Sequence, residues 1–232
     1  MKKKFLKLLG TLLLALVVVC SVFTIKGYVY YTKLQREQPL YQLMLNVENQ
    51  DDFISFDELP QDIYDATISI EDRRYLEHDG IDYISLIRAI LSQFTPIRSG
   101  GSTITQQTAK NLYGLYDSNI DRKFAEIFLA TYLERNFTKE QIFAVYVNII
   151  NYGDNSTGIV EASKNYFGLY PTQLNLQQCA ILAGIPQSPA NYQLSDHYDQ
   201  AKVRQKQVLE AMASCGYITE DDVDYYYNLS IY

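Results

Sequence analysis

Residues 66–80 read ATISIEDRRYLEHDG and join an apolar helix to a dense group of charges. The apolar positions recur at helical spacing from a helix start predicted near Pro60 to an end at Glu71. Glu71 and Asp72 thus lie at the last helical turn, where a carboxylate faces the negative end of the helix dipole. Apolar neighbours desolvate the group as well, and both effects raise the pKa of Glu71. A carboxylate tuned in this way is a candidate general base.

The two arginines that follow act in the opposite direction. Arg73 and Arg74 lower the pKa of Glu71 if they lie near it, so the sequence does not fix the net shift. The competing interpretation of this stretch is an exposed ion-pair cluster, which contributes about 0–1 kcal/mol to stability. Considered alone, the stretch slightly favours the ion-pair cluster.

Residues 99–107 read SGGSTITQQ and combine a glycine turn with a predicted helix start. Thr103 and Gln106 match a capping box, so free backbone N–H groups would point outward from a positive helix end. Such an end can bind phosphate, although no P-loop lysine follows the glycines. Lys110 lies one to two turns further along. The alternative is an ordinary capped helix.

A third charged group lies on one predicted helix face. Arg122 and Lys123 precede Glu126 by four and three residues, which places all three side chains together. A carboxylate held by two cations would suit a site that handles phosphate charge. The alternative is a solvated charged face, which is common on helices.

The N-terminus predicts a membrane anchor. Four lysines occur within residues 1–7, and residues 8–25 carry no charge. At 1.5 Å per residue this apolar run forms about 27 Å of helix, close to the thickness of a bilayer core. A cleaved signal peptide is the competing interpretation, but a small-residue cleavage site is missing. We expect residues 1–7 in the cytoplasm, a transmembrane signal anchor at 8–26, a stalk at 27–56 and an external domain at 57–232.

The rest of the sequence predicts a mainly α protein. Amphipathic stripes recur at residues 83–94, 122–135, 138–149, 174–182 and 201–213, and strand-like alternation is scarce. The net charge of −7 and the pI of about 4.9 disfavour a nucleic-acid partner.

The three cysteines and two histidines do not form a metal-binding pattern. Cys20 lies in the apolar run. Cys179 and Cys215 lie among apolar neighbours and are interpreted as buried free thiols, although the sequence leaves a disulfide between them open.

Taken in order, these stretches resemble the peptidoglycan glycosyltransferases of family 51, which include monofunctional transglycosylases and the transglycosylase domains of class A penicillin-binding proteins. The resemblance covers residues 57–219. Its motifs are IEDRRYLEHDGID, GGSTITQQTAKNLY, RKFAEIFLATYLE, EQIFAVYVNIINYGDN and GIVEASKNYFG, followed by LAGIPQSPANY. Ser-x-x-Lys and Lys-Thr-Gly do not occur, so a penicillin-binding site is not expected.

The resemblance implies a lysozyme-like helical domain with a small membrane-associated lobe, and polymerisation of lipid II into β-1,4 glycan strands. It implies that Glu71 is the base on the acceptor 4-hydroxyl, that Asp72 supports it, and that Glu126 lies near the leaving pyrophosphate. The other matching positions line a cleft for phosphate and sugar: Ser102, Gln106, Gln107, Lys110, Arg122 and Lys123. The resemblance leaves open a divalent cation, Mg²⁺ or Mn²⁺, shared between Glu126 and the phosphates.

The implied partners are lipid II, the growing glycan chain, the membrane and other cell-wall synthesis proteins. The sequence departs from the family at Ser118, where many relatives carry a basic residue, and at Ala144, which is frequently acidic. Two alternatives remain open: a lysozyme-like enzyme that cleaves glycan with a catalytic glutamate, and a non-catalytic cell-wall scaffold.

Overall fold

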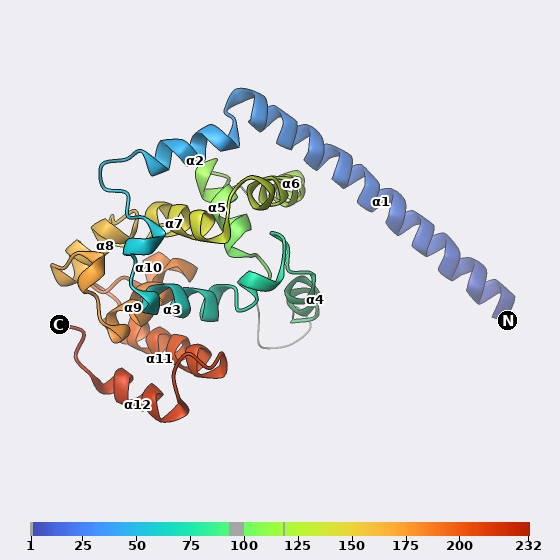
Figure 1. Ribbon diagram of the computed structural model, residues 1–232. Coiled ribbons are helices and arrows are strands. Elements are labelled where there is room, and N and C mark those ends of the chain that lie inside the picture. The colour runs from blue at the N-terminus through green and yellow to red at the C-terminus, as the bar shows by residue number, and fades with distance from the viewer. Residues whose placement is uncertain (1, 93–99, 118) are drawn as a thin grey trace.

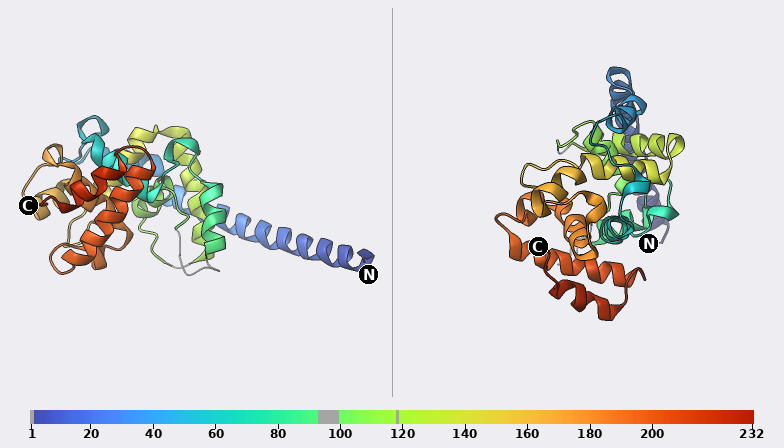
Figure 2. Two further views of the ribbon diagram at one scale, coloured as in Figure 1. Left: turned by 90° about the horizontal axis from the view of Figure 1, so that it is seen from below. Right: turned by 60° about the vertical axis from the view of Figure 1, so that its left-hand side comes forward.

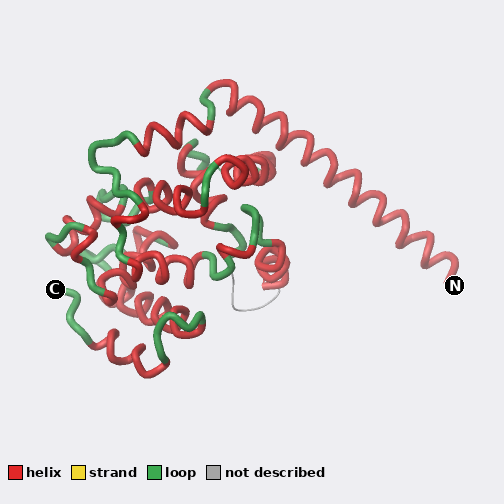
Figure 3. The backbone as a smooth tube through the Cα atoms, viewed as in Figure 1, coloured by secondary structure: helices red, strands yellow, loops and turns green. Residues whose placement is uncertain are grey.

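The computed structural model describes residues 2–92, 100–117 and 119–232 and has a mainly α architecture, as predicted (Figures 1 and 3). Within these residues, β pairing is limited to one isolated bridge between Asn151 and Thr157. The first helices are α1 (Lys2–Glu37), α2 (Leu40–Glu48), α3 (Gln61–Glu71), α4 (Tyr83–Ser92), α5 (Ile104–Leu112) and α6 (Ile120–Asn136). They are followed by α7 (Lys139–Ile149), α8 (Ile159–Phe167), α9 (Leu176–Gly184), α10 (Pro189–Tyr192), α11 (Tyr198–Ser214) and α12 (Glu220–Asn228).

Helix α1 extends away from the body of the protein, with its N-terminal end farthest out (Figures 1 and 2). Judged by length and composition alone, the helical segment Leu9–Glu37 could cross a membrane. The C-terminal part of the helix packs on α6, where the Phe23 and Phe124 rings stack at 5.9 Å. The helix therefore continues about eleven residues beyond the anchor predicted at 8–26.

Residues 27–56 do not form the stalk that we expected. Helix α2 lies within this segment, and its four buried apolar side chains pack into a core cluster with residues of α5, α6 and α7. The four are Leu40, Leu43, Met44 and Val47. Their helical spacing was present in the sequence, but the tyrosine-rich surroundings concealed it. This part of the segment belongs to the folded domain.

Helix α7 joins the two halves of the hydrophobic core. Phe143 and Tyr146 pack into the larger cluster with α3, α9 and α11, whereas Ile142 and Val145 pack into the cluster with α2 and α6. Both sides of the helix are buried, as expected for a central element. A capping box of Thr138 and Gln141 fixes where this helix begins.

The apolar stripe of α4 is exposed rather than packed in the core. Tyr83, Ile84, Ile87, Ile90 and Leu91 are each more than half exposed. Phe94, which the predicted stripe included, lies outside the described residues. The stripe forms a contiguous apolar face on the surface of the domain, and such faces mark interaction sites.

Three smaller expectations have different outcomes. Of the two departures from the family, Ala144 is buried in α7, and Ser118 lies outside the described residues. Cys20, Cys179 and Cys215 are free thiols, so the pairing left open between the last two does not form.

Candidate active site

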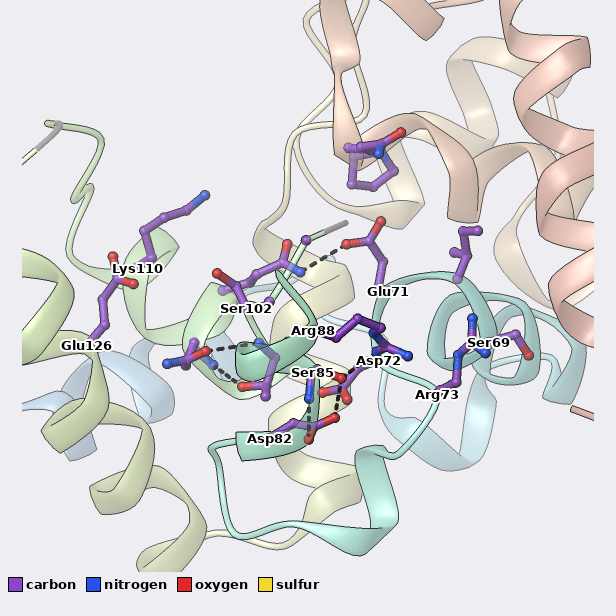
Figure 4. A pocket seen from close by; sticks show the side chains of 18 of the residues that line it. Ser69, Glu71, Asp72, Arg73, Asp82, Ser85, Arg88, Ser102, Lys110 and Glu126 are labelled. Atoms are coloured by element: carbon purple, nitrogen blue, oxygen red, sulfur yellow. Dashed lines mark hydrogen bonds between the residues drawn. The ribbon is translucent and has the colours of Figure 1, made fainter. Parts of the chain in front are cut away.

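A polar pocket of about 620 Å³ opens between α3, α4, α5, α6, the turn 185–187 and α11. Figure 4 shows Glu71 and Asp72 in one part of it and Lys110 with Glu126 in another. The three charged stretches of the sequence therefore meet in one site. The carboxylate pair ends α3, the glycine turn precedes α5, and the third group lies on the first turns of α6. Every candidate residue except Arg122 lines the pocket.

Glu71 is not part of an exposed ion-pair cluster. Its side chain is only 12% exposed, and its Oε2 atom accepts a hydrogen bond from Gln107 Nε2 at 3.0 Å. Burial is the largest influence on this carboxyl and raises its pKa above the ordinary 4.5. The Gln107 hydrogen bond and the cations Arg204 and Lys110 oppose that rise without cancelling it.

Arg204 is the cation that Glu71 contacts, and it was not among the site residues predicted from the sequence. Its Nη2 atom lies 3.5 Å from Glu71 Oε1, and its side chain is 8% exposed. The guanidinium is held by the carbonyl of Gly184 and by Gln207 Oε1. One signal could have identified it: Arg204 lies at an inward position of α11, on the same face as Ala201 and Val208, where an apolar residue is expected.

Arg73 and Arg74 do not act on Glu71 as we expected. Arg74 forms an ion pair with Asp82, and Arg73 is exposed. The helix ends at Asp72, whose φ of −156° and ψ of 68° turn the chain away from the helical path. The two arginines therefore do not lie over the last turn of α3.

Asp72 holds the first motif to the start of α5. One carboxylate oxygen lies 3.0 Å from His78 Nε2, and the other accepts the backbone N–H of Ile104 at 3.0 Å. The backbone N–H of Gly80 donates to His78 Nδ1, which assigns the ring proton to Nε2. Both carboxylate oxygens of Asp72 thus have hydrogen-bond partners inside the protein, and the side chain also lines the pocket.

The start of α5 is a capped helix, which was the alternative to a phosphate-binding end in the sequence. The capping box of Thr103 and Gln106 is formed, as predicted, and it uses the N–H of Gln106. The N–H of Ile104 is taken by Asp72. Two backbone donors of the first turn therefore have partners within the protein. Gln106 is a capping residue, whereas Gln107 donates to Glu71.

Glu126 gathers cations at the other end of the pocket. Its side chain is 1% exposed, and its oxygens lie 2.9 Å from Arg122 Nη1 and 2.6 Å from Lys123 Nζ. Lys123 also donates to Ser102 Oγ at 2.9 Å and remains 46% exposed, so it can reach a ligand. The solvated-face alternative fails for Glu126 because burial of an ionised carboxylate requires such partners.

Lys110 completes this cationic end. Burial lowers the pKa of its ammonium group, and the positive charges of Arg122 and Lys123 lower it further, against the opposing effect of Glu126. Glu126 thus pairs with Arg122 and Lys123 and acts on Lys110 electrostatically, so three cations face one buried carboxylate. Among the described residues, no three His, Cys, Asp or Glu side chains gather as a metal cage. The oxygens of Glu126 lie in ion pairs with Arg122 and Lys123, and its buried Oε1 atom has no hydrogen-bond partner.

Arg204→Met should raise the pKa of Glu71 further, because it removes a cation 3.5 Å away while keeping the side-chain stem that packs on Gly184. A higher pKa leaves less ionised base at a given pH, so the acid limb of the rate profile should move to higher pH. The control is Lys206→Met. Lys206 lies on α11, like Arg204, and its exposed ammonium group pairs with Asp224 of α12. Superposable acid limbs for Arg204→Met and the unmodified chain would contradict this role.

The chain matches a family of known proteins, and the matched residues include those of the pocket. Residues 36–213 match the family described as Transglycosylase. The chain is 37% identical over 174 residues to penicillin-binding protein 1A of Aquifex aeolicus, covering 74% of this chain and 24% of that protein. For penicillin-binding protein 1A/1B of Bacillus subtilis the identity is 37%, with coverages of 72% and 19%. A Cupriavidus necator protein named "Putative transglycosylase" is 33% identical over 190 residues, with coverages of 82% and 82%.

The chain thus spans about a quarter or less of the two penicillin-binding proteins and most of the Cupriavidus necator protein. The family match begins before α2 and ends near the C-terminus of α11, so it contains Glu71, Glu126 and Arg204. On this match, which covers well over half of the sequence, the chain belongs to the transglycosylase family.

Proposed function

We propose that this protein is a peptidoglycan glycosyltransferase that polymerises lipid II into β-1,4 glycan strands. The observation that carries the proposal is the division of one pocket into two chemically different ends. Glu71, with its raised pKa, supplies a base at one end. Lys110, Arg122 and Lys123 supply positive charge at the other. Transfer of a sugar from a lipid pyrophosphate needs both groups.

The reaction follows as a single displacement. Glu71 removes the proton from the acceptor 4-hydroxyl as that oxygen attacks the anomeric carbon of the donor sugar. The bond from that carbon to the pyrophosphate breaks, and the electron pair leaves on the undecaprenyl pyrophosphate. Lys110 and Lys123 stabilise this charge, because fixed cations in a pocket need no reorganisation. Attack opposite the leaving group inverts the configuration, which converts an α-linked donor into a β-linked glycan.

Residues around the base act by positioning. Gln107 donates to Glu71 Oε2 and leaves Oε1 between Arg204 and the pocket. Asp72 fixes the start of α5, which carries Gln107, and therefore couples the end of α3 to α5. The hydrogen bond from Lys123 to Ser102 joins the turn before α5 to α6. Both ends of the pocket are thus held at a fixed separation.

The exposed face of α4 suits a bilayer surface next to a lipid-linked substrate. We therefore propose that α1 spans the membrane with its N-terminus in the cytoplasm, and that α4 rests on the outer leaflet. Four exposed apolar residues of α4 support this placement: Ile84, Ile87, Ile90 and Leu91.

Ile87→Asp combined with Ile90→Asp should lower the polymerisation rate in vesicles by about ten-fold or more, because charges at these positions resist insertion into the bilayer. Little stability should be lost, since both side chains are exposed. Val203→Asp is the matched control, because Val203 is an exposed apolar residue on α11. An equal loss of rate in the control would contradict a specific role for α4.

The test of the function is to incubate the purified chain with lipid II in vesicles and to separate the products by size. We expect glycan polymer that a muramidase digests. Release of soluble muropeptides from purified cell walls would favour the lysozyme-like alternative, and binding of lipid II without turnover would favour the scaffold. A parallel incubation with a divalent-ion chelator tests the proposed Mg²⁺ or Mn²⁺ between Glu126 and the phosphates. Interaction with other cell-wall synthesis proteins stays a prediction.

A further inference from the structure

Gly27 lies at a very close contact between α1 and α6. A Cβ atom added to Gly27 would lie 2.4 Å from Phe124 Cβ, 2.9 Å from the Phe124 carbonyl carbon and 3.1 Å from the Ala125 backbone nitrogen. Two of these atoms belong to the backbone and cannot rotate away. The helices therefore keep this crossing only while position 27 is glycine, the one residue without a Cβ.

Aromatic contacts hold the crossing on both sides of Gly27. The rings of Phe23 and Phe124 stack at 5.9 Å. Tyr28 and Tyr31 contact Phe128 at centroid distances of 5.4 and 5.9 Å. Aromatic pairs of this kind stabilise a contact beyond the effect of their buried area. The anchor is thus attached to the domain along α6 and does not hang from a flexible stalk.

The crossing occurs where the apolar run of α1 ends. Residues 8–25 are uncharged, Lys26 follows, and Tyr28, Tyr30 and Tyr31 come within the next two turns. Lysine and tyrosine at the end of an apolar helix are typical of the boundary between lipid and water. Gly27 therefore lies at the level of the lipid headgroups.

Helix α6 presents a different face to the pocket. Lys123 immediately precedes Phe124, and with Glu126 it lines the cationic end of the site. Leu129 and Leu133 fix the same helix in the core. Because α6 is held by the core, a side chain at position 27 would displace α1 and leave the arrangement of α6 within the domain unchanged.

We propose that the Gly27–Phe124 crossing is a positioning contact that sets the height of the cationic end of the pocket above the bilayer. With the crossing formed, Lys123 lies next to the headgroup layer, where the pyrophosphate of a membrane-embedded lipid is found. The substrate then reaches its cations without being lifted from the membrane. This inference rests on the proposed function, and it assigns the anchor helix a role in presenting the substrate.

The test compares Gly27→Leu with Gly10→Leu in the full chain. Gly10 lies on the same helix and a Cβ there meets no atom within 4 Å, so the control shares the gain in helix propensity without the clash. Each chain is assayed with long-tailed lipid II in vesicles and with a short-tailed, water-soluble analogue in detergent. Gly27→Leu should lower kcat/KM by about ten-fold or more in vesicles, since small misplacements of substrate are costly, and should leave the soluble reaction nearly unchanged. Gly10→Leu should resemble the unmodified chain in both assays.

Three results would overturn the inference: equal losses on both substrates, no loss on either, or a matching loss with Gly10→Leu. A readout independent of activity uses Phe23→Cys with Phe124→Cys in a chain whose native cysteines are replaced by alanine. These substitutions remove one ring contact and keep those of Tyr28 and Tyr31 with Phe128, which hold the crossing. A short thiol crosslinker should join them, and Gly27→Leu should suppress the crosslink; an unchanged yield would also overturn it. If the unmodified chain polymerises neither substrate, the proposed function fails instead, and the crosslink still reports on the crossing.

Discussion

Replacing Glu71 by glutamine should lower the turnover of lipid II by roughly 10²–10⁴-fold, the range attributed to a positioned general base. Glutamine keeps the size of the side chain but cannot take the proton of the acceptor hydroxyl. Binding of lipid II should be preserved, because Lys110 and Lys123 remain in place. Initial rates at saturating lipid II, together with binding measured on the same sample, check this prediction.

The same substitution should leave the fold as stable or make it more stable at neutral pH. The folded-state pKa of Glu71 is raised above its ordinary 4.5, so the folded protein favours the protonated form. Stability is therefore lost as pH rises from 4.5 through the folded-state pKa, and glutamine removes that loss. The comparison is Asp65→Asn on the same helix, where Asp65 accepts from Gln61 and lies outside the pocket. Burial raises the pKa of Asp65 as well, so this substitution should change stability in the same direction and leave the rate unchanged. A large fall in melting temperature for Glu71→Gln would contradict this account of its burial.

Replacing Glu126 by glutamine should cost about ten-fold to a hundred-fold in kcat and about 2–3 kcal/mol in stability, the scale of charge-assisted hydrogen bonds and preorganised electrostatic groups. The carboxylate holds Arg122 and Lys123 together. Without it, these cations and Lys110 repel one another and no longer converge on the departing pyrophosphate. Steady-state rates and thermal unfolding measure the two effects.

Glu134→Gln is the matched control for Glu126. Glu134 lies on the same helix, is 7% exposed and pairs with Lys139 at 2.8 Å, but it does not line the pocket. It should lose a similar amount of stability and keep its catalytic rate. If both substitutions reduced the rate equally, Glu126 would support the fold rather than the departing phosphate.

Local signals in the sequence correctly predicted several elements of the fold. The capping box at Thr103 was identified because a cap depends on residues three positions apart. The end of α3 at Glu71 followed from the change from apolar helix to charge. These features depend on neighbours in the chain, and they position the two motifs that carry the base and Gln107.

Contacts between distant parts of the chain could not be predicted in the same way. Arg204 reaches Glu71 across more than a hundred residues, and nothing local indicates which carboxylate it meets. The directions of Arg73 and Arg74 depend on the backbone turn at Asp72. The use of the Ile104 N–H by Asp72 depends on how α3 meets α5, and the sequence shows no sign of this contact.

The most direct test of the central claim is the pH dependence of the polymerisation rate at saturating lipid II. If Glu71 is the base, its raised pKa predicts an acid limb above 4.5, with the rate falling as the carboxylate is protonated. The residual rate of Glu71→Gln should lack this limb. A limb that persists unchanged in Glu71→Gln, or a rate independent of pH through this range, would contradict the assignment of Glu71 as the base.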